Sequence, residues 1–312
     1  MVDTIQTKEG AVAINADTRI SMRSMRRGKT KMILTPASLA SHLKANGRKL
    51  GEGIAVLYEQ FEKESPTFFA FFSAENKAKN KFPDEIFLLD RTRVILNEKP
   101  DYYHASYVDG CEQAKQYVLA QAPFDEATAG DFFRLVTQCK PEVIVVLMDL
   151  NADDDEQYII SSKSKKYGTI NIRNEKEEKR EEKYSHYELI ITKEMEKEEK
   201  IEQKYHLLTF NTWTNDMVIP QDDLIMFHKV VHKLLDDKAR ECSQLVVCPS
   251  GAHRAGIWAV FDTEAERLKI KKRIRFTDTI KSVRNQRCNT IEHFELFNGL
   301  LNLLATYAKT QI

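Results

Sequence analysis

The stretch from Gln244 to Asp262, QLVVCPSGAHRAGIWAVFD, constrains the fold more than any other part of this sequence. Gln244–Val247 is a short apolar run that predicts a buried strand, and the apolar stretch after Arg254 predicts a buried helix. Between them lies a tight loop that begins at Cys248. Backbone N–H groups and the helix dipole make such a strand–loop–helix junction an anion site. The planar guanidinium of Arg254 can bind two phosphate oxygens. A phosphate-binding loop is therefore expected; the alternative is a buried cysteine beside an unrelated surface arginine.

Composition excludes several other classes of function. The chain has 312 residues, 42% of them apolar, which is enough for one large domain or two small ones. Its formal net charge is zero, so no bulk attraction to nucleic acid or to an anionic membrane is expected. Five cysteines are odd in number and lack metal-type spacing, so we expect neither a disulfide framework nor a metal or other cofactor. Without a secretory segment or a long apolar run, a cytoplasmic setting with no transmembrane segment is expected.

The N-terminal segment differs from the rest of the chain. Residues 1–31 lack apolar periodicity and are basic toward their end. A disordered tail is expected there, and a targeting signal or a contact with an anionic surface is the alternative. Residues 32–312 are expected to form the folded domain, beginning with two helices after Thr35 that are interrupted near Gly47.

Further motifs match one protein family in the same order along the chain. They are ENKAKNKFPDEIFLLDRTRVIL from Glu75, DYYHASYVDG from Asp101, YVLAQAP from Tyr117, and FTDTIKSVRNQRCNTIEHFELFN from Phe276. Together with the Cys-x5-Arg loop, they resemble the tyrosine-specific, cysteine-dependent protein phosphatases. The resemblance implies a single α/β domain with a central twisted mixed sheet flanked by helices. Cys248 then corresponds to the family's nucleophile, and Arg254 with the amides of Ser250, Gly251, Ala252 and His253 to its phosphate-holding groups.

The family's phosphotyrosine-recognition loop corresponds to residues 79–84. Phe82 stands where the family usually has the tyrosine that stacks on the phosphotyrosine ring, and ordinary core packing is the alternative. Asp84 stands where an aspartate holds the substrate backbone. The resemblance therefore implies a phosphotyrosine-containing protein as the partner. It gives no oligomeric state.

The general-acid loop departs from the family. The family pattern Trp-Pro-Asp-x-Gly-x-Pro corresponds to Trp213–Pro220, which is one residue longer. Counted from Trp213, the acid position holds Asn215, which has no carboxylic proton; counted back from Pro220, it holds Asp216. Asp216 is thus the candidate acid, and a surface carboxylate in a turn is the alternative. Loss of a positioned acid typically lowers the rate by about 10²- to 10⁴-fold.

Other departures also concern catalytic groups. Val247 replaces a histidine before the nucleophile, and Ala255 replaces the hydroxyl residue that helps the thiolate leave the phosphoenzyme. Pro249 removes one N–H from the loop. Glu292 stands where a glutamine orients the hydrolytic water, and its charge would repel a bound phosphate.

Three interpretations follow. The first is a pseudophosphatase that binds phosphotyrosine in signalling with weak or absent phosphatase activity. The second is an active phosphatase that works through a phosphocysteine, with Cys248, Arg254 and Asp216 as its catalytic residues. The third is a scaffold without a working pocket. The intact Cys248–Arg254 pair argues against the third, and the losses at catalytic positions favour the first.

Overall fold

The computed structural model describes residues 65–150, 156–160, 164–194, 200–235 and 242–311. Within these limits the chain from Pro66 to Ile312 forms one compact unit. The expected basic tail of residues 1–31, the domain start at residue 32 and the two helices expected after Thr35 lie outside the described residues.

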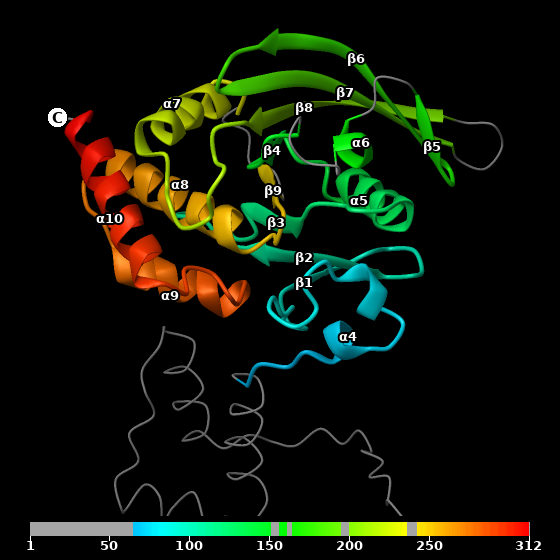
Figure 1. Ribbon diagram of the computed structural model, residues 1–312, viewed down its shortest axis with the longest axis horizontal. Coiled ribbons are helices and arrows are strands. Elements are labelled where there is room, and N and C mark those ends of the chain that lie inside the picture. Colours follow the sequence, from blue (N-terminus) through cyan, green and yellow to red (C-terminus); the bar gives the residue numbers. More distant parts are fainter. Residues whose placement is uncertain (1–64, 151–155, 161–163, 195–199, 236–241, 312) are drawn as a thin grey trace, which may run out of the picture. The chain divides into compact units, whose positions relative to one another are not determined.

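One mixed sheet of nine strands runs through the described residues (Figure 1). Its spatial order is β1-β2-β3-β9-β4-β8-β7-β6-β5. The central neighbours β3, β9, β4 and β8 run parallel, whereas the outer pairs are antiparallel. The strands are β1 (Arg93–Ile95), β2 (Tyr102–Val108), β3 (Tyr117–Gln121), β4 (Val143–Val146), β5 (Lys165–Tyr167), β6 (Ile170–Arg180), β7 (Tyr184–Glu194), β8 (Lys200–Phe210) and β9 (Gln244–Cys248).

Helices cover both faces of the central strands, as Figure 1 shows. Phe227, Trp258 and Leu300 of α7, α8 and α10 pack with one face, and Phe132 of α5 packs with the other. The helices are α4 (Phe69–Phe72), η1 (Lys77–Lys79), α5 (Glu126–Cys139), α6 (Glu156–Ile159), α7 (Gln221–His232), α8 (His253–Lys271), α9 (Phe276–Gln286) and α10 (Phe294–Lys309). The expected α/β domain with a mixed sheet flanked by helices is confirmed.

Strand β9 explains why the sequence signal around Gln244 is so clear. All five of its residues are buried, because β3 and β4 flank it on both edges and helices cover both faces. Leu245 and Val247 belong to the α5 side of the core, while Val246 and Cys248 belong to the α8 side. A parallel strand buried on both faces reads as a continuous apolar run. The expected strand is confirmed and extends one residue further, to Cys248.

Helix α5 begins before the point that its apolar residues suggested. The apolar residues after Asp131 predict a helix that starts there, but the helix already begins at Glu126, just after Asp125. The Asp125 side chain accepts a hydrogen bond from the Thr128 N–H at 2.7 Å, and the Thr128 hydroxyl accepts one from the Asp125 N–H at 3.0 Å. This capping box starts the helix a turn and a half earlier. Phe132 and Phe133 are fully buried, as expected for core residues.

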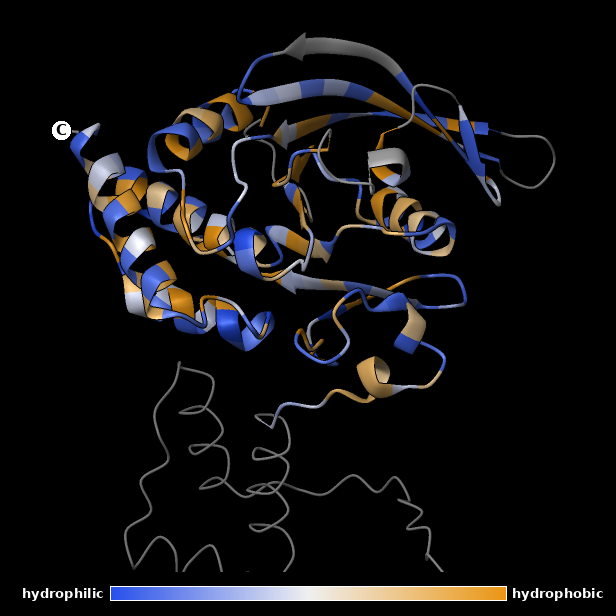
Figure 2. Ribbon diagram, viewed as in Figure 1, coloured by the Kyte–Doolittle hydropathy of each residue, from blue (hydrophilic) through white to orange (hydrophobic). Residues whose placement is uncertain are grey.

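The charge-rich segments on either side of residue 184 form long antiparallel strands. β6, β7 and β8 pair along most of their length and extend beyond the central sheet (Figure 1). β7 and β8 carry both hydrophilic and hydrophobic stretches in Figure 2, and their buried apolar residues belong to the core: Leu189, Ile190 and Ile191 of β7, and Leu207, Leu208 and Phe210 of β8. The sequence predicts strands at residues 187–191 and 205–210, and both lie within β7 and β8.

Candidate active site

The predicted phosphate loop lies where β9 ends and α8 begins. Cys248 is the last residue of β9 and is fully buried, and His253 is the first residue of α8. Gly251 has a φ of +65°, and a Cβ there would come within 2.3 Å of the Gln121 nitrogen. A side chain at this position would therefore force the loop away from the end of β3. Ala252 and Ala255 are also buried at this junction.

Three N–H groups of the loop are engaged within the loop itself. The Ser250 hydroxyl accepts hydrogen bonds from the N–H groups of Ala252 at 3.2 Å and His253 at 3.1 Å. The N–H of Gly251 donates to the carbonyl of Cys248 at 3.1 Å. Pro249 has no N–H to offer. A phosphate that needs these donors must therefore compete with the Ser250 hydroxyl, which lies 3.7 Å from the Cys248 sulfur.

A buried arginine holds the loop from behind. Arg287 is 1% exposed, and its guanidinium donates to the carbonyls of Gly251 at 2.9 Å and Ser250 at 3.0 Å. A third bond, 2.9 Å long, goes to Nδ1 of His104, which must accept because the guanidinium has only donors. Burial, with the nearby Arg287 charge, lowers the pKa of His104 well below its usual value and keeps the ring neutral. Arg287 thus fixes the carbonyls of the loop so that its N–H groups face inward.

Arg254 is paired with Asp216 of the expected acid loop. Nε of Arg254 donates to Oδ1 of Asp216 at 2.5 Å, and its Nη1 donates to the Leu147 carbonyl at 3.0 Å. Nδ1 of His253 lies 3.6 Å from the other Asp216 oxygen. His253 and Arg254 together lower the pKa of Asp216 to about 2, against the opposing effect of burial. Asp216 is therefore ionised at neutral pH, and it occupies one N–H of the Arg254 guanidinium that is expected to hold phosphate.

The structure distinguishes Asn215 from Asp216. The Asn215 side chain accepts a hydrogen bond from the Met217 N–H at 2.9 Å, and the Asn215 carbonyl accepts from Nε1 of buried Trp213 at 3.2 Å. Asn215 therefore shapes the turn, whereas Asp216 is the residue that reaches Arg254. Whether Asp216 takes the place of the family's proton donor stays a prediction.

The expected recognition loop meets the phosphate loop at the end of β3. Gln121 accepts from the Lys81 N–H at 3.2 Å and donates to the Lys79 carbonyl at 2.6 Å. The same residue lies against Gly251. Phe82 is half-buried and Asp84 is exposed in this segment. Their loop is thus anchored beside the phosphate loop, and their contact with a substrate ring or backbone stays a prediction.

The segment that carries Glu292 meets the phosphate loop through a neighbouring residue. The Thr290 hydroxyl lies 3.5 Å from the Ala252 carbonyl and packs where a side chain on Gly256 would stand. Glu292 itself is exposed and accepts a hydrogen bond from Asn289 at 3.0 Å. The predicted repulsion between Glu292 and a bound phosphate therefore requires a carboxylate that turns inward from this position.

Sequence reasoning missed the groups that hold the loop in place. Gln121, His104 and Arg287 were used only to align motifs, although all three are buried beside the loop. The available signal was their type, because buried polar side chains need partners. Arg287 bonds to carbonyls of the phosphate loop, His104 bonds to Arg287, and the Gln121 side chain bonds to the recognition loop. The cluster of metal-type ligands in the described residues lies elsewhere, between α7 and α8.

Comparison with known proteins agrees with this arrangement. The family model described as protein-tyrosine phosphatase matches residues 76–306. Mouse receptor-type tyrosine-protein phosphatase alpha is 28% identical over 241 residues, covering 74% of this chain and 28% of the relative. Tyrosine-protein phosphatase 69D of Drosophila melanogaster is 27% identical over 259 residues, covering 76% and 17%. The chain thus spans less than a third of the length of these curated relatives.

Solved structures give the same fold. A structure of PTPN18, described as a study of its fingerprint on HER2 phosphorylation sites, has a TM-score of 0.69 at 21% identity and covers 82% of this chain and 92% of its own. A second, of PTPN18 in complex with HER2 phosphopeptides, has a TM-score of 0.68 at 21% identity and covers 88% and 99%. Within the part of the chain described, none of the helices is long and apolar enough to cross a membrane. The family match, the sheet order and the Cys248–Arg254 loop agree: this chain belongs to the protein-tyrosine phosphatase family.

Proposed function

We propose that this chain binds phosphotyrosine-containing proteins at the Cys248–Arg254 loop and hydrolyses their phosphotyrosine weakly or not at all. It would act in phosphotyrosine signalling, with the fold of a phosphoric monoester hydrolase and impaired catalysis. The observation that carries the impairment is the pairing of Asp216 with Arg254, with the pKa of Asp216 at about 2. A group that is ionised at neutral pH has no proton for the departing tyrosine oxygen.

The same pairing implies that phosphate binding is competitive. Asp216 and a phosphate dianion carry the same sign of charge and would use the same guanidinium. The Asp216 side chain is 42% exposed, so it can leave Arg254 when a phosphate arrives. Binding is therefore retained but weakened, because the ion pair with Asp216 must first be broken.

The second candidate is an active phosphatase, which the position of Asp216 beside Arg254 supports. A phosphate on Arg254 would displace Asp216 and place two negative charges close together, which raises the pKa of the carboxyl group. Displacement would then convert Asp216 into a proton donor. The unpaired Cys248 is consistent with a nucleophile in a reducing, cytoplasmic compartment.

The first experiment tests binding. A phosphotyrosine peptide is titrated into the Cys248→Ser protein by calorimetry, which prevents turnover. Arg254→Ala in that background should abolish binding, because the bidentate contact has no substitute. Arg284→Ala, an exposed arginine on α9, is the matched control and should bind normally. Equal binding by the Arg254 and Arg284 variants would contradict the proposed site.

The second experiment separates the two candidates. Asp216→Asn should bind vanadate more tightly, because the competing charge is gone, and should change turnover of a phosphotyrosine peptide by less than about tenfold. An acid catalyst would instead lose about 10²- to 10⁴-fold. Wild-type turnover of roughly 1 to 10³ per second would also establish the active phosphatase.

A further inference from the structure

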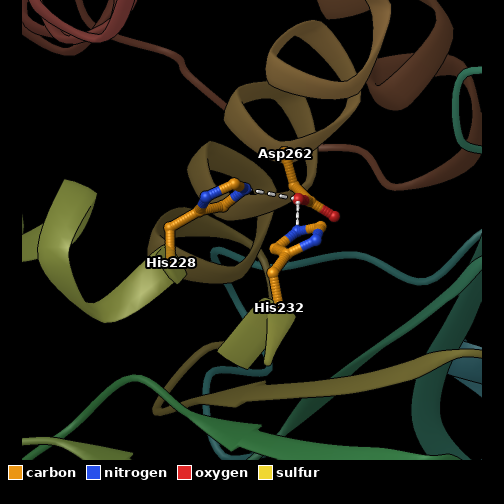
Figure 3. A group of neighbouring side chains, drawn as sticks. All are labelled: His228, His232 and Asp262. Atoms are coloured by element: carbon orange, nitrogen blue, oxygen red, sulfur yellow. Dashed lines mark hydrogen bonds and ion pairs between the residues drawn. The ribbon is translucent and has the colours of Figure 1, made fainter. Parts of the chain in front are cut away.

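Three buried or half-buried side chains converge between α7 and α8, away from the phosphate loop. His228 and His232 lie one helical turn apart on α7, and Asp262 lies on α8 (Figure 3). Nε2 of His228 is 2.7 Å from Oδ1 of Asp262, and Nε2 of His232 is 2.5 Å from the same oxygen. Both imidazoles thus point at one carboxylate oxygen, and the three groups can offer ligand atoms within 4.8 Å of one another.

We propose that His228, His232 and Asp262 form a binding site for one divalent transition-metal ion of the zinc class. Imidazole nitrogen and carboxylate oxygen are established zinc ligands, and two histidines with a carboxylate leave one position for water. The site goes beyond the proposed phosphotyrosine function and does not depend on it.

The ligand spacing fits such an ion after a small movement. A tetrahedral ion with bonds of about 2.0–2.2 Å holds its ligands roughly 3.3–3.6 Å apart. The two nitrogen–oxygen distances must therefore lengthen by roughly an ångström or less, which side-chain rotation on two neighbouring helices can supply. To bind the metal, each Nε2 that now faces Asp262 must be free of its hydrogen; in a neutral imidazole that hydrogen moves to Nδ1, so the tautomer changes on binding.

The surroundings of Asp262 have the form of an outer layer around a metal ligand. Its second oxygen, Oδ2, accepts hydrogen bonds from the Tyr117 hydroxyl at 2.8 Å and from Nε2 of Gln244 at 2.7 Å. Gln244 is itself held by Nε1 of Trp258 at 2.8 Å. These bonds fix the carboxylate and leave Oδ1 directed at the histidines, as outer partners do in metal sites.

Access and charge also suit a cation. Asp262 and His228 are 1% and 2% exposed, but the His232 side chain is 27% exposed, so the open position faces solvent on that side. Glu266 lies one turn further along α8; burial and the Asp262 charge raise its pKa. A divalent ion would relieve the repulsion between these two carboxylates.

Occupancy would clamp two helices of the candidate active site. α7 follows directly after the Trp213–Pro220 segment that carries Asp216, and α8 begins with the residues that carry Arg254. A metal bridge between α7 and α8 should therefore raise the thermal stability of this part of the domain.

The test uses the full chain with Cys248→Ser, so that the loop cysteine is removed as a ligand. The protein is stripped with chelator, loaded with zinc or cobalt chloride, dialysed, and analysed for bound metal, for melting temperature and, with cobalt, for its absorption spectrum. We expect one equivalent of metal, a rise in melting temperature, and cobalt d–d bands without the intense near-ultraviolet band that a thiolate ligand gives.

His232→Gln tests the site directly. The half-exposed position tolerates the change, and the glutamine amide can still donate to Asp262. This variant should keep the melting temperature of the chelator-treated protein. It should lose metal affinity at least about tenfold, because even loss of an outer partner of a ligand costs about that much. His206→Gln, which alters the separate His186–His206 pair on β7 and β8, is the control and should bind metal normally.

Three outcomes would overturn the proposal. They are absence of bound metal in the Cys248→Ser protein, equal binding by the His232→Gln and His206→Gln variants, and a thiolate band in the cobalt spectrum. The last would assign the metal to another cysteine. Because phosphotyrosine binding is measured separately with Arg254→Ala, either idea can fail without the other.

Discussion

At the scale of single residues, the candidate site is occupied by its own side chains. Asp216 bonds to Arg254, and the Ser250 hydroxyl bonds to two N–H groups of the loop. Each of these groups is the kind that a phosphate oxygen would use. The free protein thus satisfies its anion site internally, and a phosphorylated ligand must displace both.

Ser250→Ala should strengthen binding of vanadate or a phosphotyrosine peptide by roughly two- to tenfold. The N–H groups of Ala252 and His253 then lack a partner in the free protein, and a hydrogen bond is worth about 0.5–1.5 kcal/mol net. Calorimetry on wild type and variant measures the change. Thr290→Ser, which alters a hydroxyl residue behind the loop, is the control and should leave the affinity nearly unchanged. Weaker binding by Ser250→Ala would mean that the hydroxyl supports the ligand instead of competing with it.

At the scale of elements, the phosphate loop depends on segments that are distant in the sequence. β3 supports Gly251, and the end of α9 supplies Arg287. The junction of β9 and α8 is local, so its strand, loop and helix could be predicted from a few consecutive residues. The partners of the loop could not, because they come from other elements, Arg287 lying 36 positions from Gly251 and Gln121 lying much further away, and their approach depends on packing.

The same reason explains what the sequence left open in the acid loop. Counting from Trp213 or from Pro220 gave different residues, since an inserted residue can be absorbed at any point of a turn. In the structure the Asn215 side chain closes the turn and Asp216 reaches Arg254, and the assignment of the acid position stays a prediction. The His228–His232–Asp262 cluster was also missed. Asp262 is far from the two histidines in the sequence, and only the packing of α8 on α7 brings it to them.

Arg287→Met should destabilise the domain, because Arg287 holds the phosphate loop in place. The change keeps the length of the side chain but leaves the carbonyls of Ser250 and Gly251 and Nδ1 of His104 without their donor. Each buried group that loses its partner costs about 1–3 kcal/mol, so we expect a loss of at least about 2 kcal/mol in the free energy of unfolding. Urea denaturation measures this. Arg284→Met, at an exposed position near the end of α9, should change stability by less than about 0.5 kcal/mol. Equal effects of the two variants would contradict the role of Arg287.

At the scale of the whole molecule, the fold buries His104, an ionisable residue that links segments far apart in the sequence. His104 lies on β2, near the start of the described chain, and contacts Arg287 near the C-terminal helices. Its Nε2 lies 3.1 Å from the Ile86 carbonyl and is the ring nitrogen that carries the proton. Both ring nitrogens are therefore used, and a second proton on the ring would face the Arg287 charge.

This arrangement predicts that stability falls as pH decreases. Burial, with Arg287, lowers the pKa of His104 in the folded state well below its value of about 6.5 in an unfolded chain. The unfolded state then binds more protons, so the stabilising contribution is complete above about pH 6.5 and declines below it. The decline from this one group is at most about 1.4 kcal/mol per pH unit.

Urea denaturation from about pH 7.5 down to about pH 5.5 measures the effect, with chelator present so that bound metal does not contribute. His228 also has a lowered pKa through burial, so the wild-type slope alone does not identify His104. His104→Gln isolates it, because the glutamine oxygen can still accept from Arg287 but does not titrate. The stability difference between wild type and His104→Gln should narrow as pH falls below about 6.5. Parallel curves over this range would mean that His104 takes up its proton without opening the contact between β2 and the phosphate loop.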